Sequence, residues 1–294
     1  AGLFVSSGTQ GNLVSLLSHG NRGDEVICGI DSHIFNWEAG GMSVLGGMYP
    51  KPLPTDEIGR LNPADVEAAV RPDNPHMAIS RIVCAENSSG GNFGAAIPPG
   101  YFADIRTVAD QHGLKFHLDG ARLFNATTSL GIDVKEVTQY VDSASLCLSK
   151  GLCAPVGSVV VGEAEFIHKA RRMRKLVGGA MRQAGVVAAA GIIALEEMTK
   201  RLDVDHKHAR MLANGLAENR YITIDPDRVE TNMVFFNVTP DAPNGGHDLA
   251  SRLKSEHKIL CNGYPQKGFR AVTHYWITEE SVNTFIDAVN LILK

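Results

Sequence analysis

HLDGAR at residues 117–122 and SLCLSKG at residues 145–151 are the two stretches that decide the fold of this 294-residue chain. Each begins as a short apolar strand and ends on polar side chains. The first carries Asp119 and Arg122, and the second stops on Lys150. Ligands of open parallel sheets bind beyond the carboxyl ends of the strands, where we expect these side chains to lie. A carboxylate and a lysine at strand ends can also form an ordinary structural ion pair, so the pair alone does not define a function.

Short apolar strands alternate with helices through the first two thirds of the chain. Strands are predicted at residues 26–30, 81–86 and 115–119, each followed by a helical pattern. This alternation is typical of an α/β fold with a mostly parallel sheet covered by helices on both faces. The later pattern is α+β. We therefore predict a large domain over residues 1–200 and a small C-terminal domain over residues 201–294.

Three local patterns give more specific expectations. Residues 33–45 are predicted to form one helix. Asn62 followed by Pro63 predicts a capped helix start. The run MRQAGVVAAAGIIALEEM (181–198) is apolar nearly all round, which predicts a helix that is buried in the core or packed at a subunit interface.

Composition excludes several classes of function. The net charge of −4 gives no general field for nucleic acid, so any anion site must be local. No stretch approaches the ~20 apolar residues of a membrane span. The 5 cysteines are scattered without a CxxC pair, which indicates a reducing compartment, and we expect a cytoplasmic protein. Histidines and cysteines show no metal-ligand spacing, so no metal site is predicted.

The polar residues at the strand ends fit an enzyme that uses pyridoxal 5′-phosphate (PLP). Lys150 supplies an amine that can condense with the cofactor aldehyde, and Asp119 supplies a carboxylate that keeps the pyridine nitrogen protonated. Arg122 can hold a substrate carboxylate through two hydrogen bonds, and Arg270 is a second candidate from the small domain. The alternative for either arginine is a solvated surface residue.

Further candidates lie in three other segments. SSGTQGN (6–12) combines small residues with a helix start, which favours a phosphate, although a plain turn is the alternative. His33 follows the second strand and could stack on a pyridine ring or move a proton. The basic run at 169–175 is usually a solvated face, unless Lys175 or Arg182 turns towards the cofactor.

At these residues the chain resembles the low-specificity L-threonine aldolases, which are fold-type-I PLP enzymes related to the β-eliminating lyases. AGLFVSSGTQGN, DSHIFNWEAGG, HLDGARLFNA, SLCLSKGLCAPVGSVVVG and RKLVGGAMRQAG occur in family order. The resemblance implies cleavage of L-threonine, L-allo-threonine and related β-hydroxy-α-amino acids to glycine and an aldehyde. It also implies threonine catabolism, glycine biosynthesis and a homo-oligomer, either a dimer or a homotetramer, with shared active sites.

The resemblance implies a role for each candidate residue. Lys150 would form the Schiff base, Asp119 would hold the ring nitrogen and His33 would stack on the ring. Gly8 and Thr9 would cradle the phosphate. The resemblance further implies that Arg122 and Arg270 bind the substrate carboxylate. It implies that Arg122, Lys175 and Arg182 contact the cofactor, and that Lys175 and Arg182 do so in the same or a neighbouring subunit.

Two departures from the family pattern leave alternatives open. The family usually begins further upstream, with an arm that contributes to the active site. The chain also reads Glu86-Asn87-Ser88-Ser89 where the family commonly has Glu-Asn-Thr-His, so that Ser89 replaces a histidine expected at the substrate β-hydroxyl. The alternatives are β-elimination or transamination in the same fold, or a cofactor-binding protein with weak or no activity.

Overall fold

The computed structural model describes residues 1–264 and 268–294. These residues form two compact units, Ala1–Lys200 and Arg201–Lys294. The first unit contains a seven-stranded sheet and the second a four-stranded sheet.

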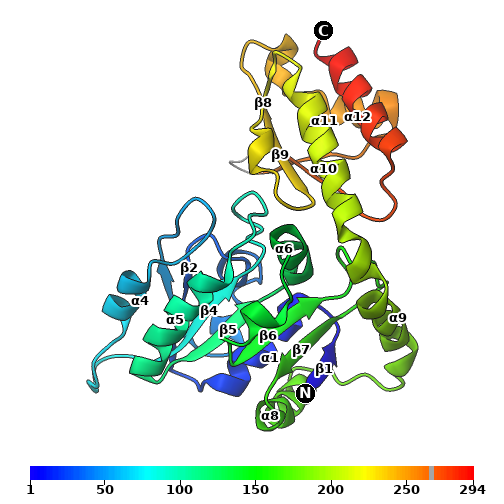
Figure 1. Cartoon of the computed structure of the whole chain (residues 1–294). Helices are drawn as coiled ribbons and strands as arrows, with labels where there is room; N and C mark the ends of the chain where they lie inside the picture. Colours follow the sequence, from blue (N-terminus) through cyan, green and yellow to red (C-terminus); the bar gives the residue numbers. More distant parts are fainter. Residues whose placement is uncertain (265–267) are drawn as a thin grey trace. The chain divides into compact units, whose positions relative to one another are not determined.

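The seven-stranded sheet of the large unit has the order β1-β7-β6-β5-β4-β2-β3 (Figure 1). Of these strands β7 runs opposite to the others, since it pairs antiparallel with both β1 and β6 while the remaining pairs are parallel. The mostly parallel α/β sheet predicted from the sequence is therefore confirmed. The strands are β1 (Gly2–Val5), β2 (Glu25–Gly29), β3 (Tyr49–Leu53), β4 (Ser80–Glu86), β5 (Lys115–Asp119), β6 (Ser143–Cys147) and β7 (Ser158–Gly162).

Helices cover both faces of this sheet. On one face α1 (Gly8–His19) packs with α8 (Ala164–Leu176), and on the other α4 (Pro63–Ala69) packs with α5 (Pro99–His112) (Figure 1). The predicted cap of α4 is confirmed, because the Asn62 side chain accepts a hydrogen bond from the Ala64 backbone. The other helices of this unit are α2 (His33–Asn36), α3 (Gly41–Val44), α6 (Leu123–Leu130), α7 (Lys135–Thr138) and α9 (Gly185–Glu196).

Alternation along β5 separates an apolar face from a polar one. Phe116 and Leu118 are fully buried in the core that includes α5. His117 and Asp119, which alternate with these two residues along the strand, point to the opposite face of the sheet. There both reach the side chain of Asn12 on α1. A strand that looks uniformly apolar by composition thus presents two polar groups to a single helix.

The same alternation on β6 brings α1 close to the sheet. Ser145 and Cys147 point towards α1, where Gly11 and Gly8 respectively lie against them. A Cβ atom on Gly8 would lie 2.9 Å from the Cys147 sulfur, which is closer than real side chains approach. Glycine at these helical positions therefore allows the close packing that aligns α1 with the ends of β5 and β6.

The single helix predicted over residues 33–45 is wrong. α2 and α3 are separate, and between them Ala39 and Gly40 have φ values of 53° and 67°. Left-handed backbone cannot continue a right-handed helix, so the chain turns there. This turn places Glu38, which is buried, next to His33.

The apolar helix predicted over 181–198 forms as α9, but it is not buried within the part of the chain that the structure describes. Val186 is 82% exposed, and Ile192 and Ile193 are each 59% exposed. Large apolar side chains exposed together on one helix are typical of an interaction surface. Of the two predicted alternatives, burial in the core is therefore wrong.

In the described part of the small unit, α-helices pack against an antiparallel sheet. Its strand order is β10-β11-β9-β8. The core between the layers includes Leu216, Phe236 and Val289. No helix in the described ranges is long and apolar enough to cross a membrane. The elements are α10 (Leu202–Ala217), β8 (Ile222–Thr223), β9 (Met233–Val238), α11 (Leu249–His257), β10 (Asn262–Tyr264), β11 (Gly268–Val272) and α12 (Glu279–Ile292).

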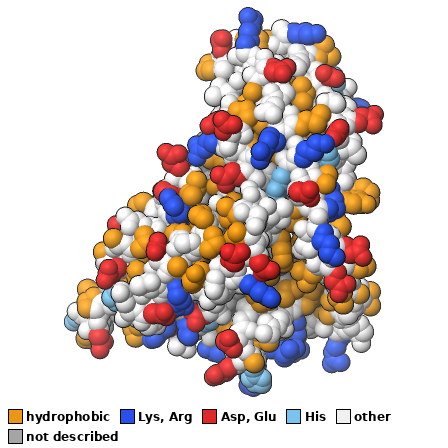
Figure 2. All heavy atoms as spheres, in the orientation of Figure 1, with side chains coloured by type: hydrophobic (Ala, Val, Ile, Leu, Met, Phe, Trp, Pro, Cys, Tyr) orange, Lys and Arg blue, Asp and Glu red, His pale blue; other side chains and the backbone are white. Residues whose placement is uncertain are grey.

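Figure 2 shows acidic and basic side chains interspersed over one face of the molecule, with hydrophobic side chains between them. Charges of mixed sign cancel over distances beyond the Debye length of about 8–10 Å. This face therefore presents no extended field of one sign to an anion.

Candidate active site

The candidate site lies at the carboxyl ends of β4, β5 and β6. Glu86 ends β4 and is paired in register with Asp119, which ends β5. Asp119 is in turn paired with Ser145 on β6, and Lys150 follows the end of that strand by three residues. Parallel strands end at one edge of a sheet, so these polar residues share that edge. Lys150 is half-buried there.

Asp119 is a buried carboxylate held by two donors. Its side chain is in a residue only 4% exposed. Oδ2 accepts a hydrogen bond from Asn12 Nδ2 at 2.9 Å, and Oδ1 accepts one from the Ala121 backbone at 3.1 Å. One donor comes from α1 and the other from the loop after β5, and together they orient the carboxylate.

Two further carboxylates surround His33. Its Nδ1 lies 3.1 Å from Glu38 Oε1, and its backbone N–H donates to Glu86 Oε2 at 2.8 Å. Burial, followed by the nearby charge of Asp119, raises the pKa of Glu86 to about 7. Burial also raises the pKa of Glu38, and the hydrogen bond to Glu38 raises the pKa of His33. Neither glutamate was predicted from the sequence, although Glu86 ends a buried strand just as Asp119 does.

The carboxylates of Glu38 and Asp119 could pair with a cation that a ligand supplies. His33, Glu38 and Asp119 have ligand-type atoms within 4.8 Å of one another, a grouping that could hold a metal ion. Within the described residues, no lysine or arginine forms an ion pair with Glu38 or Asp119. Buried charges need such partners. A protonated pyridine nitrogen is a buried cation of this kind, so these residues fit PLP.

The N-terminus of α1 lies at the same edge of the sheet and is a candidate for binding an anion. Ser7 is the N-cap, and its hydroxyl accepts from the Gln10 backbone at 3.1 Å. Gly8 lies against Cys147 at the end of β6, and Thr9 is exposed. The free N–H groups of a helix start favour an anion. The predicted phosphate residues thus lie at the edge that carries Lys150.

Four other basic side chains are candidates for contact with a ligand. Lys175 and Arg182 are both exposed, and Gly179 between them packs against the side chain of Gln10 near the start of α1. Arg122 is half-buried directly before α6. Arg270 lies on β11 of the small unit, half-buried, on the wall of a cavity of about 520 Å³. Contact of these four with a ligand remains a prediction.

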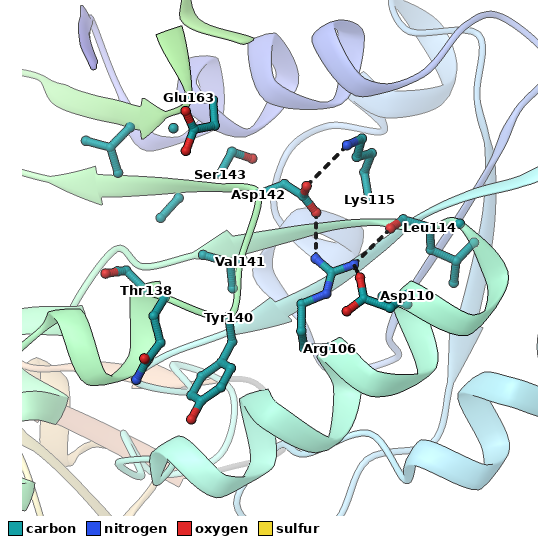
Figure 3. Close-up of a pocket in the computed structure, with 16 residues that line it drawn as sticks. Arg106, Asp110, Leu114, Lys115, Thr138, Tyr140, Val141, Asp142, Ser143 and Glu163 are labelled. Atoms are coloured by element: carbon teal, nitrogen blue, oxygen red, sulfur yellow. Dashed lines mark hydrogen bonds and ion pairs between the residues drawn. The ribbon is translucent and has the colours of Figure 1, made fainter. Parts of the chain in front are cut away.

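A cavity of about 560 Å³ lies at the opposite edge of the large sheet (Figure 3). Its wall includes Lys115 and Ser143, which begin β5 and β6. Arg106 and Lys115 both bind Asp142, at 2.8 and 3.2 Å. These charges satisfy one another, so the cavity has the character of a structural ion-pair cluster and is separate from the candidate active site.

A model of the β-eliminating lyase family matches residues 1–239 of this chain. Over 287 residues the chain is 42% identical to a probable low-specificity L-threonine aldolase 2 of Arabidopsis thaliana, covering 96% of this chain and 80% of that protein. The chain belongs to the β-eliminating lyase family, among the low-specificity L-threonine aldolases. The predicted resemblance is thereby confirmed. The low-specificity L-threonine aldolase of Escherichia coli K12 is 39% identical over 282 residues, covering 96% of this chain and 81% of that enzyme.

Solved structures support the fold-type-I assignment. A putative L-allo-threonine aldolase from Listeria monocytogenes superposes with a TM-score of 0.81 at 18% identity, covering 99% of this chain and 82% of that one. The threonine aldolase of Leishmania major gives a TM-score of 0.80 at 21% identity, covering 100% and 84%. At these identities the likeness concerns the fold alone, which is the predicted fold.

Ser89, which stands where the resemblance implies a histidine, is a buried residue in this chain. It is 4% exposed, and its Oγ accepts a hydrogen bond from Asn92 Nδ2 at 3.1 Å. Gly59 packs directly against it from another loop. The serine hydroxyl therefore binds within its own loop in this structure, and Gly59 and Asn92 are the neighbours that a larger side chain at this position would meet.

Proposed function

We propose that this protein is a PLP-dependent aldolase that cleaves L-threonine, L-allo-threonine and related β-hydroxy-α-amino acids to glycine and an aldehyde. The observation that carries the proposal is the buried, doubly hydrogen-bonded carboxylate of Asp119 at the sheet edge shared with Lys150. A buried carboxylate that pairs with no lysine or arginine among the described residues suits a protonated ring nitrogen. The identity of 42% to a plant enzyme named for this reaction supports the same conclusion.

The residues of the large unit would hold each part of the cofactor. Lys150 would hold the aldehyde, Asp119 the ring nitrogen, and the N–H groups at Gly8 and Thr9 the phosphate. His33 would pack against the ring. When bound, PLP supplies an electron sink for the bond broken at the substrate Cα.

The two arginines would orient the substrate. Arg122 follows Asp119 by three residues, and a guanidinium group can hold a carboxylate through two parallel hydrogen bonds. Arg270 would be a second group for binding a carboxylate. Lys175 and Arg182 would neutralise the phosphate, in the same or a neighbouring subunit. Fixing the substrate carboxylate sets which Cα bond lies in line for cleavage, and this contribution is mainly orientation.

His33 is our candidate for the proton transfer at the β-hydroxyl. Glu38 holds its Nδ1, which leaves Nε2 for exchange with the substrate. The Glu38 bond raises the pKa of His33. A general acid–base group works best when its pKa lies near the working pH, and such a group contributes about 10²–10⁴-fold in rate. The proton leaves the β-hydroxyl as the Cα–Cβ bond breaks, the aldehyde departs, and Cα gains a proton to give glycine.

We further propose that the protein works as a homo-oligomer in the cytoplasm, with residues 1–200 as the large PLP-binding domain and 201–294 as a small C-terminal domain. The exposed apolar side chains of α9 support a contact with a second copy. All 5 cysteines are free thiols, and this supports a reducing compartment.

Product analysis tests the proposed reaction. The protein is loaded with PLP and given L-threonine or L-allo-threonine. Glycine and acetaldehyde in equal amounts are expected. Ammonia with a keto acid would instead indicate β-elimination or transamination, and a cofactor absorbance band without turnover would indicate a binding protein of weak or no activity.

A further inference from the structure

A chain of hydrogen bonds runs through the protein interior from His19 to Asp119. His19 Nε2 lies 2.7 Å from Ser143 Oγ, and Ser143 Oγ lies 2.8 Å from His117 Nδ1. His117 Nε2 lies 3.1 Å from Asn12 Oδ1. Asn12 Nδ2 then reaches Asp119 Oδ2 at 2.9 Å. We call these five residues the α1 relay, because α1 supplies both His19 and Asn12 while β5 and β6 supply the rest.

The relay crosses the sheet from one edge to the other. Ser143 begins β6, on the wall of the cavity in Figure 3, whereas Asp119 ends β5 at the candidate active site. Ser143, His117 and Asn12 are each at most 1% exposed. Water therefore does not compete for these groups, and each donor must meet its acceptor inside the protein.

The chemistry of the end groups dictates the direction of every bond in the relay. An ionised carboxylate only accepts, so the Asn12 amide must turn its Nδ2 towards Asp119. The same Nδ2 also donates to Glu38 Oε1 at 2.8 Å. Asn12 Oδ1 is therefore an acceptor, and His117 must carry its proton on Nε2.

The two histidines complete this order because both are neutral. Burial lowers the pKa of His117 to about 3 and that of His19 to about 4. A neutral imidazole with its proton on Nε2 accepts at Nδ1, so the Ser143 hydroxyl must donate to His117. The Ser143 oxygen then accepts from His19 Nε2–H. All donors point towards Asp119, and bonds aligned in this way polarise one another.

We propose that Asn12, His117 and Ser143 are positioning residues. Together they fix the orientation of the Asn12 amide, and the amide holds the carboxylates of Asp119 and Glu38 at a fixed separation. Because Glu38 in turn binds His33, the relay sets the spacing between the carboxylate for the ring nitrogen and the imidazole against the ring. This inference rests on the proposed function, since it concerns how the two groups meet PLP. None of the three residues touches the reacting atoms in this role.

Of the three positioning residues Ser143 is the most informative, because along the relay it is the furthest from Asp119. Replacing it with alanine removes the donor to His117 Nδ1, so that the proton of His117 is no longer confined to Nε2. The acceptor Nδ1 is then left unpaired in the interior, at a cost of about 1–3 kcal/mol for a buried polar group. The His117 ring is held from one side only, so the Asn12 amide that it supports is less firmly fixed.

Neutron diffraction of the unaltered protein tests the relay without any assay. The expected result is a hydrogen on His117 Nε2, none on Nδ1, and the Ser143 hydroxyl hydrogen directed at His117. A hydrogen on His117 Nδ1, or the Asn12 amide oxygen facing Asp119, would overturn the inference. This experiment does not depend on the proposed function or on any variant that fails to fold.

Two variants then test positioning. For Asn12→Ala the dissociation constant of PLP is expected to rise about tenfold or more, since this variant loses hydrogen bonds to two carboxylates. For Ser143→Ala, which loses bonds to neutral imidazoles, a rise of about two- to tenfold is expected. The double variant should lose less than the product of the two effects, because both break one relay. Ser15→Ala is the matched control, as its buried hydroxyl binds only the Gly11 carbonyl on α1.

The outcomes separate the two proposals. If the parent protein binds PLP and cleaves threonine while Ser143→Ala has the same PLP affinity, the relay inference fails and the proposed function stands. If the parent binds no PLP, the proposed function fails, and the neutron result still decides the direction of the relay. Strictly multiplicative effects of the two variants would show that they act separately, which also overturns the inference.

Discussion

Glu38 Oε1 lies 3.1 Å from Nδ1 of His33, and this contact orients an imidazole that the sequence places at the candidate site. The same oxygen accepts from Asn12, which also binds Asp119. The buried Glu38 therefore connects His33, which is expected to pack against the cofactor ring, with Asp119, which is expected at the ring nitrogen. The first prediction tests this link.

Glu38→Gln is expected to lower the pKa of His33, because the hydrogen bond to Glu38 is the largest cause of its raised value. A histidine with a raised folded pKa stabilises the protein below its unfolded pKa of about 6.5, and that stability is lost as the pH rises through the folded value. The variant should therefore lose more stability at pH 5–6 than at pH 8. NMR titration of His33 and unfolding at both pH values measure this, and an unchanged titration would contradict it.

Lys150→Ala should abolish the absorbance of the bound cofactor near the visible edge together with all turnover. The reason is that Lys150 is the lysine at the sheet edge where Asp119 ends β5. Absorbance spectra and borohydride reduction measure the effect. Lys254→Ala on α11, an exposed lysine, is the control. Borohydride-trappable cofactor in Lys150→Ala would assign the covalent link to another lysine.

Asp119→Asn should fold but lose roughly two orders of magnitude or more in rate, since a preorganised charge contributes about 3–4 kcal/mol to a transition state. Steady-state kinetics of threonine cleavage and thermal unfolding measure both parts. Asp104→Asn, at an exposed position on α5, should retain full rate. A near-parental rate in Asp119→Asn would mean that this carboxylate does not meet the ring nitrogen.

Ser89→His is expected to lower the free energy of unfolding by about 1–3 kcal/mol, the usual effect of overpacking a buried site. The imidazole would displace Gly59 and break the bond from Asn92. Denaturant unfolding compares it with Ser89→Ala, which loses only the hydrogen bond. If Ser89→His instead kept its stability and cleaved threonine faster, the loop would have to open and bring residue 89 to the substrate.

Ile192→Glu with Ile193→Glu on α9 should reduce the oligomer to smaller species. Both side chains are 59% exposed in one chain, and a charge in an apolar interface remains unpaired there. Sedimentation analysis gives the mass of each species. Met77→Glu, at another exposed apolar residue, is the control and should leave the mass unchanged. An unchanged mass for the double variant would exclude α9 from the subunit contact.

The local backbone and the ends of the strands could be predicted from the sequence, because they depend on neighbours along the chain. Short apolar runs place Asp119 and Glu86 at strand ends, and Asn62 with Pro63 starts a helix. The predicted helix over 33–45 is wrong although Gly40 and Gly41 offer a local signal for its break, since paired glycines favour a turn and Gly40 has left-handed backbone.

What only the tertiary structure decided is which polar side chains meet. Asn12 is separated from His117 by 105 residues and from Asp119 by 107, and no local pattern joins them. Their contact follows from the close packing of α1 on β6, where the glycines at positions 8 and 11 bring the helix against the sheet. The sequence by itself determined the chemical groups and the sheet edge at which they lie. Packing across the sheet face decided their partners, because hydrogen bonds between buried groups depend on distances that only the folded chain sets.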